Sequence, residues 1–236
     1  VTRPDGSHRD FTYDATTGNV LKIERPAVGG LTPTFNMTWN GRGQILTKAD
    51  ETGIVTSMVY DATTEKLLSV VNDFGVGPHL NLTTNFGYDS VGNVTSVQDP
   101  LGRTTTFIFD SLRRMTRRTE AAPFNHQTRF AYDENSNLLS VRRQTGIVAT
   151  PWQINTFGYS LSDKKIRATD PAGNITRWFY DGADRLRRVR DAENREYVYG
   201  YDQLNRVRTV IDPTGVTSAT GLYSDNGKLR SVKDAR

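Results

Sequence analysis

The hydrophobic pattern of the chain repeats at intervals of about 23 residues. An aromatic residue followed by aspartate or a short polar residue recurs ten times, and nine of the ten residues two positions earlier are large and apolar. A spacing of two places both side chains on one face of a strand, so the pattern predicts ten strands with a buried stripe, each ending at its aromatic residue. The clearest example is Thr176–Tyr180.

A turn and a second strand follow each aromatic residue. The turns contain glycine and asparagine, as in Ser90–Asn93, and these residues accept a positive φ at low cost. The second strands carry apolar anchors three positions apart, such as Val94 and Val97, or Leu186 and Val189. A period of two cannot place such anchors on one face, so either a bulge realigns them or the strand packs on both sides.

A second kind of turn ends each repeat. Asp99–Gly102, Asp170–Gly173 and Asp212–Gly215 spell Asp-Pro-x-Gly, which is typical of a type I turn whose aspartate accepts backbone N–H bonds. The repeat is therefore a β-hairpin. We expect an all-β fold, in which antiparallel hairpins form one long curved, spiralling sheet with almost no helix, and residues 1–236 are a single array of about ten repeats.

Composition agrees with a sheet that has little core. The chain has 30 Thr against 14 Ala, and Leu, Ile, Val and Phe make up 54 of its 236 residues. The 30 basic and 26 acidic residues nearly cancel and are spread along the chain, so we expect no nucleic-acid partner. No apolar run is long enough for a membrane span. The chain begins at Val1, and we expect it to be a piece of a longer polypeptide.

The segment Tyr88–Asp110 resembles the Rhs repeat, also called the YD repeat, and Asp170–Leu186 repeats the spelling. The resemblance implies hairpins joined into a sheet that spirals into a hollow shell. Such shells occur in bacterial polymorphic toxins, in the B and C components of insecticidal toxin complexes and in teneurins. The resemblance also implies that the chain is a non-enzymatic segment of a bacterial protein that is secreted or displayed at the cell surface. Such a segment would enclose a C-terminal toxin or build an extracellular scaffold. Its partners would be that toxin and the remaining shell.

The aromatic–aspartate pairs could be taken for catalytic dyads. A catalytic dyad is needed once, however, whereas these pairs recur in almost every hairpin, so a structural role is expected. The aspartates would accept turn amides and the rings would pack together. The signature residues are Tyr13, Asp14, Trp39, Tyr60, Asp61, Tyr88, Asp89, Phe109, Asp110, Tyr132, Asp133, Tyr159, Tyr180, Asp181, Tyr201, Asp202 and Tyr223.

No cofactor or metal site is expected. The chain has no cysteine, and His8, His79 and His126 share no ligand spacing. Asp133–Asn137 begins like a calcium loop, but Leu138 stands where the loop needs glycine and Gln144 where it needs glutamate. We therefore expect no catalytic residue and no enzyme.

Two binding alternatives stay open. Arg187, Arg188 and Arg190 could face an acidic cargo or a sulfated glycan, although a solvated strand face is the simpler interpretation. The repeats could instead bind carbohydrate or a cell surface, which exposed Trp39, Trp152 or Trp178 would favour. A glycoside hydrolase would need two facing carboxylates, and repetition makes no pair stand out. Exposed sheet edges could also support self-association.

Overall fold

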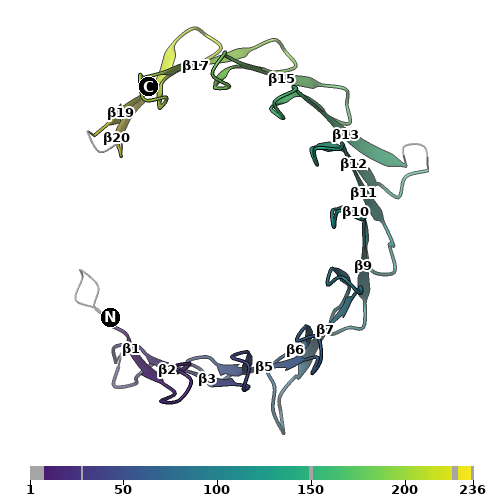
Figure 1. Ribbon diagram of the computed structural model, residues 1–236, viewed down its shortest axis with the longest axis vertical. Coiled ribbons are helices and arrows are strands. Elements are labelled where there is room, and N and C mark those ends of the chain that lie inside the picture. Colours follow the sequence, from purple (N-terminus) through teal and green to yellow (C-terminus); the bar gives the residue numbers. More distant parts are fainter. Residues whose placement is uncertain (1–7, 28, 149–150, 225–227, 235–236) are drawn as a thin grey trace. The chain divides into compact units, whose positions relative to one another are not determined.

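The computed structural model describes residues 8–27, 29–148, 151–224 and 228–234, and their regular structure is entirely β (Figure 1). Within these ranges the strands are β1 (Asp10–Tyr13), β2 (Val20–Glu24), β3 (Thr34–Trp39), β4 (Ile45–Ala49), β5 (Val55–Tyr60), β6 (Leu67–Asn72), β7 (Leu82–Tyr88), β8 (Val94–Gln98), β9 (Thr104–Phe109), β10 (Met115–Thr119), β11 (Gln127–Tyr132), β12 (Leu138–Gln144), β13 (Trp152–Tyr159), β14 (Lys165–Thr169), β15 (Ile175–Tyr180), β16 (Leu186–Arg190), β17 (Glu196–Tyr201), β18 (Val207–Ile211), β19 (Thr217–Tyr223) and β20 (Leu229–Asp234). Every odd-numbered strand ends at a predicted aromatic position.

The chain divides into two units, one comprising Val1–Phe109 with Thr119–Asn125 and the other Asp110–Arg118 with His126–Arg236. In the first unit β1 to β9 pair antiparallel, each with its neighbour in sequence. In the second unit β11 to β20 pair in the same way. Each unit is a run of hairpins in a single layer, which confirms the predicted all-β hairpin fold (Figure 1).

A β-bulge sets the register of these hairpins. Phe86 pairs with Val97 and Tyr88 with Val94, and the register shifts between Gly87 and Tyr88. The same shift precedes Tyr180, whose hairpin pairs Trp178 with Val189 and Tyr180 with Leu186. The extra residue places anchors three apart opposite aromatic residues two apart, so the bulge is the correct one of the two open explanations.

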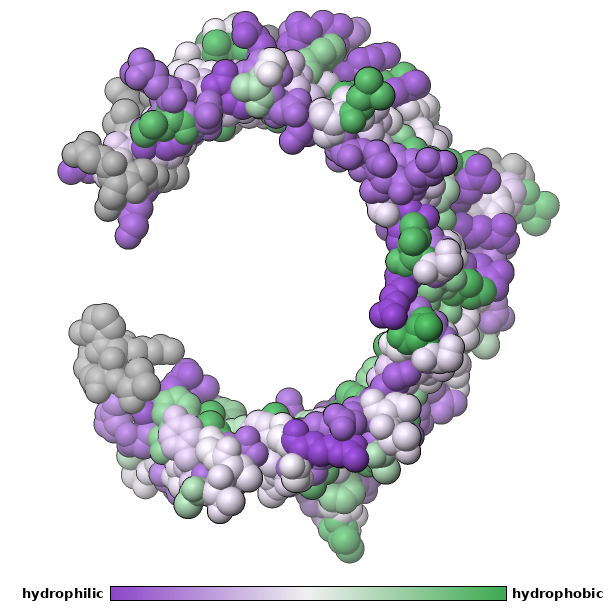
Figure 2. Space-filling view, in the orientation of Figure 1, coloured by the Kyte–Doolittle hydropathy of each residue, from purple (hydrophilic) through white to green (hydrophobic). Residues whose placement is uncertain are grey.

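No described residue is fully buried, so the prediction of a buried stripe is wrong. Most of the aromatic positions are half-buried, and Tyr13 is 55% exposed. The reason is architectural, because a single layer has no second layer to cover its apolar face. Figure 2 shows hydrophilic and hydrophobic residues interspersed along each unit. Side chains of neighbouring hairpins must therefore supply the cover that a core would otherwise give.

Candidate functional site

Most of the turns, both within a hairpin and between one hairpin and the next, are built around an aspartate side chain. After Tyr201, the Asp202 Oδ1 accepts the backbone N–H groups of Leu204 (2.9 Å) and Arg206 (3.0 Å), and its Oδ2 accepts Arg206 Nε at 2.7 Å. Asp99, in an Asp-Pro-x-Gly turn, holds Leu101 and Arg103 in the same way. The turn within a hairpin and the turn between two hairpins therefore have the same conformation, although their sequences differ.

The fourth residue of this turn has a positive φ. It is glycine in some turns, such as Gly102 at 77°, and a polar residue in others, such as Asn205 at 61°. The fifth residue pairs with the aspartate through its side chain, as arginine at Arg103, Arg114, Arg185, Arg195 and Arg206, and as asparagine at Asn93, Asn137 and Asn174. The turns after Asp14 and Asp61 are one residue longer, and each aspartate binds two threonines.

Six tyrosine hydroxyls each link a hairpin to the one before it. Tyr201 Oη donates to the carbonyl oxygen of Leu186 at 2.7 Å, and Leu186 is the first residue of β16 in the preceding hairpin. Trp39 makes the same link through Nε1 to Val20 O at 2.8 Å. The remaining links run from Tyr88 to Leu67, Tyr132 to Met115, Tyr159 to Leu138, Tyr180 to Lys165 and Tyr223 to Val207.

Basic side chains lie over the same rings. The Arg185 guanidinium stands 5.0 Å from the Tyr201 ring centroid while its Nε donates to Asp181 Oδ2 at 2.8 Å. A turn aspartate, its arginine and the tyrosine of the next hairpin thus form one group, which we call a hairpin clamp. The clamps are Asp110–Arg114–Tyr132, Asp181–Arg185–Tyr201 and Asp202–Arg206–Tyr223.

The pKa of the aspartate is lowered in all three clamps. The Arg185 side chain, followed by its backbone N–H, lowers the pKa of Asp181, and Arg206 lowers the pKa of Asp202 in the same order. Burial raises the pKa of Tyr201. The folded chain therefore prefers ionised aspartates and neutral tyrosines.

This preference predicts loss of stability in acid. Because the folded pKa of these aspartates lies below the ordinary 3.8, the unfolded chain binds protons first as the pH falls. The unfolding midpoint should stay level from neutral pH to about pH 5 and then decline, as the pH falls through 3.8 and the lower folded pKa values. Thermal melts followed by circular dichroism would measure this. An Asp181→Asn/Asp202→Asn variant should decline less steeply, and an equal slope would contradict the assignment.

The three predicted ligand-facing arginines do not act together. Arg188 and Arg190 both contact Glu196, at 3.3 Å from Nη1 and 2.6 Å from Nε, and both lie over the Phe179 ring. Arg187 is exposed and is the extra residue of the bulge. Two of the three predicted positions therefore already have a carboxylate partner.

The tryptophans that would favour sugar binding are all half-buried. Trp39 Nε1 donates a hydrogen bond to the carbonyl oxygen of Val20. The Arg129 guanidinium lies 5.1 Å from the centroid of the Trp152 ring, and Lys165 Nζ lies 4.7 Å from that of the Trp178 ring. None of the three is therefore the exposed tryptophan that would favour sugar binding.

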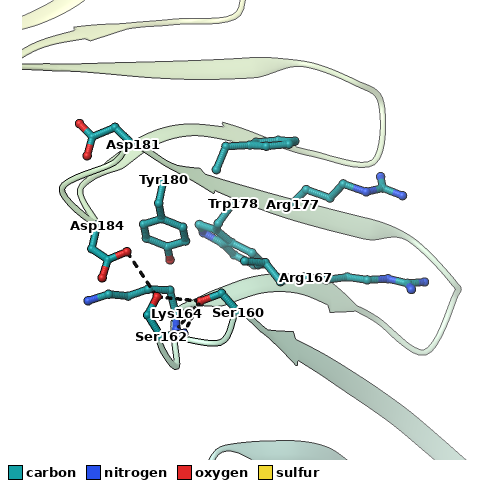
Figure 3. A pocket seen from close by; sticks show the side chains of 11 residues that line it. Ser160, Ser162, Lys164, Arg167, Arg177, Trp178, Tyr180, Asp181 and Asp184 are labelled. Carbon is teal, nitrogen blue, oxygen red and sulfur yellow. Dashed lines mark hydrogen bonds between the residues drawn. The ribbon is translucent and has the colours of Figure 1, made fainter.

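A pocket lies against β14 and β15, beside the turn that joins β13 to β14 (Figure 3). The Ser162 hydroxyl donates to Asp184 Oδ1 at 3.3 Å and lies 3.1 Å from the Ser160 hydroxyl. Among the described residues that line it, none is a histidine that could activate a serine. In the described chain no group of three or more His, Cys, Asp or Glu side chains could hold a metal ion. No helix among these residues is long and apolar enough to cross a membrane.

Comparison with known families identifies the repeat. The RHS Repeat family model matches residues 88–123 and 180–217. The chain contains RHS repeats. These two segments include every hairpin-clamp residue except Tyr132 and Tyr223.

One relative of the RHS-repeat chain is the Double-stranded DNA deaminase toxin A of Burkholderia cenocepacia (strain H111), which is 32% identical over 135 residues. The match covers 53% of this chain and 9% of the toxin, so the chain corresponds to a small part of that protein.

Solved structures share the fold. The TcdB2-TccC3-Cdc42 crystal structure matches with a TM-score of 0.73 at 14% identity, over 97% of this chain and 14% of that one. The Photorhabdus luminescens Tc holotoxin pore, with a mutation in TccC3, matches with a TM-score of 0.54 at 11% identity, over 100% of this chain and 17% of that one. The RHS-repeat chain thus has the fold of a segment of these toxin proteins.

Sequence reasoning placed the signature residues at strand ends but missed the basic partners. Arg114, Arg185 and Arg206 stand four residues after an aspartate, and this recurring spacing was a usable signal. Their contact with the tyrosine of the next hairpin spans about 16 to 18 residues, which only the register of the intervening strands reveals.

Proposed function

We propose that this chain is a non-enzymatic wall segment of an Rhs-type shell, which encloses a toxin carried by the same polypeptide or by a partner. The observation that carries the proposal is the linkage of consecutive hairpins by hydroxyl and arginine contacts, in a single layer whose described residues form no buried core. A wall needs contacts between neighbours more than a filled interior. The toxin relative and the fold shared with TcdB2-TccC3 support the same interpretation.

The signature residues have a structural role in this proposal. Aspartates fix the turns, and tyrosines with Trp39 fasten successive hairpins, so a catalytic function is required of neither. Secretion or display at the bacterial surface follows from enclosure of a toxin. Glycan binding and self-association through sheet edges stay predictions.

The enclosure proposal is tested in the full-length parent polypeptide. A triple variant that opens all three clamps, Arg114→Gln/Arg185→Gln/Arg206→Gln, should expose the enclosed domain to limited proteolysis about tenfold faster, because cleavage follows the population of opened wall. Mass spectrometry of the fragments over time would measure the rate.

The matched control removes three exposed arginines instead, Arg143→Gln/Arg187→Gln/Arg208→Gln, and should leave the protection intact. If the domain outside this chain is digested as fast in the wild-type parent as it is alone, the segment is not an enclosing wall.

A further inference from the structure

A row of arginines crosses the second unit on the sheet face opposite the tyrosines. The strand register pairs Arg167 of β14 with Arg177 of β15, and Arg177 with Arg190 of β16. Glu196 of β17 is the next member, and Gly158 of β13 pairs with Arg167 at the other end. Adjacent strands lie about 4.8 Å apart, so the three arginines span roughly 10 Å.

The row departs from its equivalents in other hairpins. The positions equivalent to Gly158, Arg167 and Arg177 hold Thr38, Thr47 and Ser57 in one row, and Gly87, Ser96 and Thr106 in another. Small hydroxyl residues there can bond directly, as the Thr38 and Thr47 hydroxyls do at 2.6 Å. The fold therefore does not require arginine at these positions.

Among the described residues, Arg167 and Arg177 have no acidic partner of their own. Both side chains are exposed, and neither makes a hydrogen bond or ion pair with another residue in the ranges that the structure describes. Figure 3 shows the two side chains extending in the same direction from neighbouring strands. Like charges directly opposite each other on adjacent strands destabilise a sheet, so the pair has a cost that the wall itself does not repay.

The other end of the row shows which chemistry fits. The Glu196 carboxylate joins Arg190, through Oε1 at 2.6 Å, to Arg188, through Oε2 at 3.3 Å. These contacts lower the pKa of the Glu196 carboxyl, chiefly through the hydrogen bond from Arg190. A carboxylate side chain thus already binds Arg190 of the row together with Arg188 of the same strand. Arg167 and Arg177 present a second pair of guanidinium groups, without a carboxylate among the described residues.

We propose that Arg167 and Arg177 form a docking site for an acidic segment of polypeptide, with carboxylates binding this pair as Glu196 binds Arg188 and Arg190. Charge complementarity favours this partner. A nucleic acid is less well matched, because Glu196 places a negative charge in the row and phosphate backbones need longer basic tracks. The site needs only this unit, and it does not depend on whether the parent encloses a toxin.

The test uses the whole 236-residue chain and a fluorescent oligoglutamate peptide, with oligoglutamine as the neutral probe. Arg167→Gln/Arg177→Gln should weaken oligoglutamate binding about tenfold in fluorescence anisotropy, since two charge-assisted contacts are lost. The matched variant Arg143→Gln/Arg208→Gln removes the same charge from exposed positions, and should change the affinity by less than about twofold. Glu196→Gln should strengthen binding, because it frees Arg188 and Arg190.

Three results would overturn the proposal. One is an equal loss of affinity in the two double variants, which would indicate only general attraction of a basic chain. Another is an affinity for oligoglutamine that matches that for oligoglutamate. The third is tighter binding of heparin or single-stranded DNA that is lost in Arg167→Gln/Arg177→Gln, which would assign the row to a different class of polymer. Unchanged circular dichroism spectra would verify that each variant is folded.

Discussion

Replacing Tyr201 with alanine should give the largest loss of stability of any single substitution among the clamp residues, roughly 2–4 kcal/mol in the free energy of unfolding. The variant loses the half-buried ring, the 2.7 Å hydrogen bond to Leu186 O and the surface over which Arg185 lies. Arg185 then keeps its ion pair with Asp181 but no longer lies over an aromatic ring. The Leu186 carbonyl oxygen loses its hydrogen-bond donor. Chemical denaturation followed by tyrosine fluorescence and circular dichroism would measure the change.

Two further variants separate the contributions of the ring and the hydroxyl. Tyr201→Phe should cost only about 1 kcal/mol, the usual net value of one hydrogen bond. Tyr197 lies on the same strand and is 42% exposed, so Tyr197→Ala should cost clearly less than Tyr201→Ala. Equal costs for the two alanine variants would show that the position before the turn has no special role.

The effect of Tyr201→Ala should also be local. Each hairpin contacts its sequence neighbours, so the stability of such an array is a sum of repeat and interface contributions. Hydrogen exchange should therefore increase in β16 and β17 more than in β3 and β4, which belong to the other unit. A uniform increase along the chain would indicate a single cooperative unit instead.

The sequence was sufficient for the strands because their signals are local. Alternation, turn glycines and the aromatic position before each turn all lie within one hairpin, and the odd strands end where that pattern predicts. The bulge could not be chosen from sequence, because anchors three apart are compatible with either explanation until Tyr88 is seen opposite Val94. A one-residue change of register exchanges the two faces of a strand, so facing residues are the least predictable feature.

The arginines show the same limit more sharply. Arg187, Arg188 and Arg190 are conspicuous in sequence because they lie close together, yet Glu196 already binds two of them. Arg167 and Arg177 are ten residues apart and unremarkable until the register places them opposite each other. Clustering along the chain measures charge density, whereas a binding site depends on proximity across strands. Density therefore pointed to the arginines that have a carboxylate partner rather than to Arg167 and Arg177, which have none within the described ranges.

The turn chemistry leads to the second large effect. Asp202→Ala should lower the thermal midpoint by about 3 to 6 °C, because the backbone N–H groups of Leu204 and Arg206 lose their acceptor and Arg206 loses its carboxylate. Asp202→Asn should cost less, since its amide oxygen can still accept both N–H groups. Some loss should remain, because the new NH₂ group and the Arg206 guanidinium are both hydrogen-bond donors and cannot bond to each other. Differential scanning calorimetry would rank the variants.

A turn elsewhere in the chain supplies the rescue for this experiment. Asn40 stands at the aspartate position, its Oδ1 accepts the N–H groups of Arg42 and Gln44 at 3.0 Å, and its Nδ2 donates to Gln44 Oε1 at 2.7 Å. Asp202→Asn/Arg206→Gln copies that pairing, so it should recover part of the stability that Asp202→Asn loses. The recovery should be incomplete because Arg206 also lies 4.4 Å from the Tyr223 ring centroid. If the double variant is less stable than the sum of its single changes, aspartate and asparagine turns are not interchangeable, and the arginine pairing is specific to the clamps.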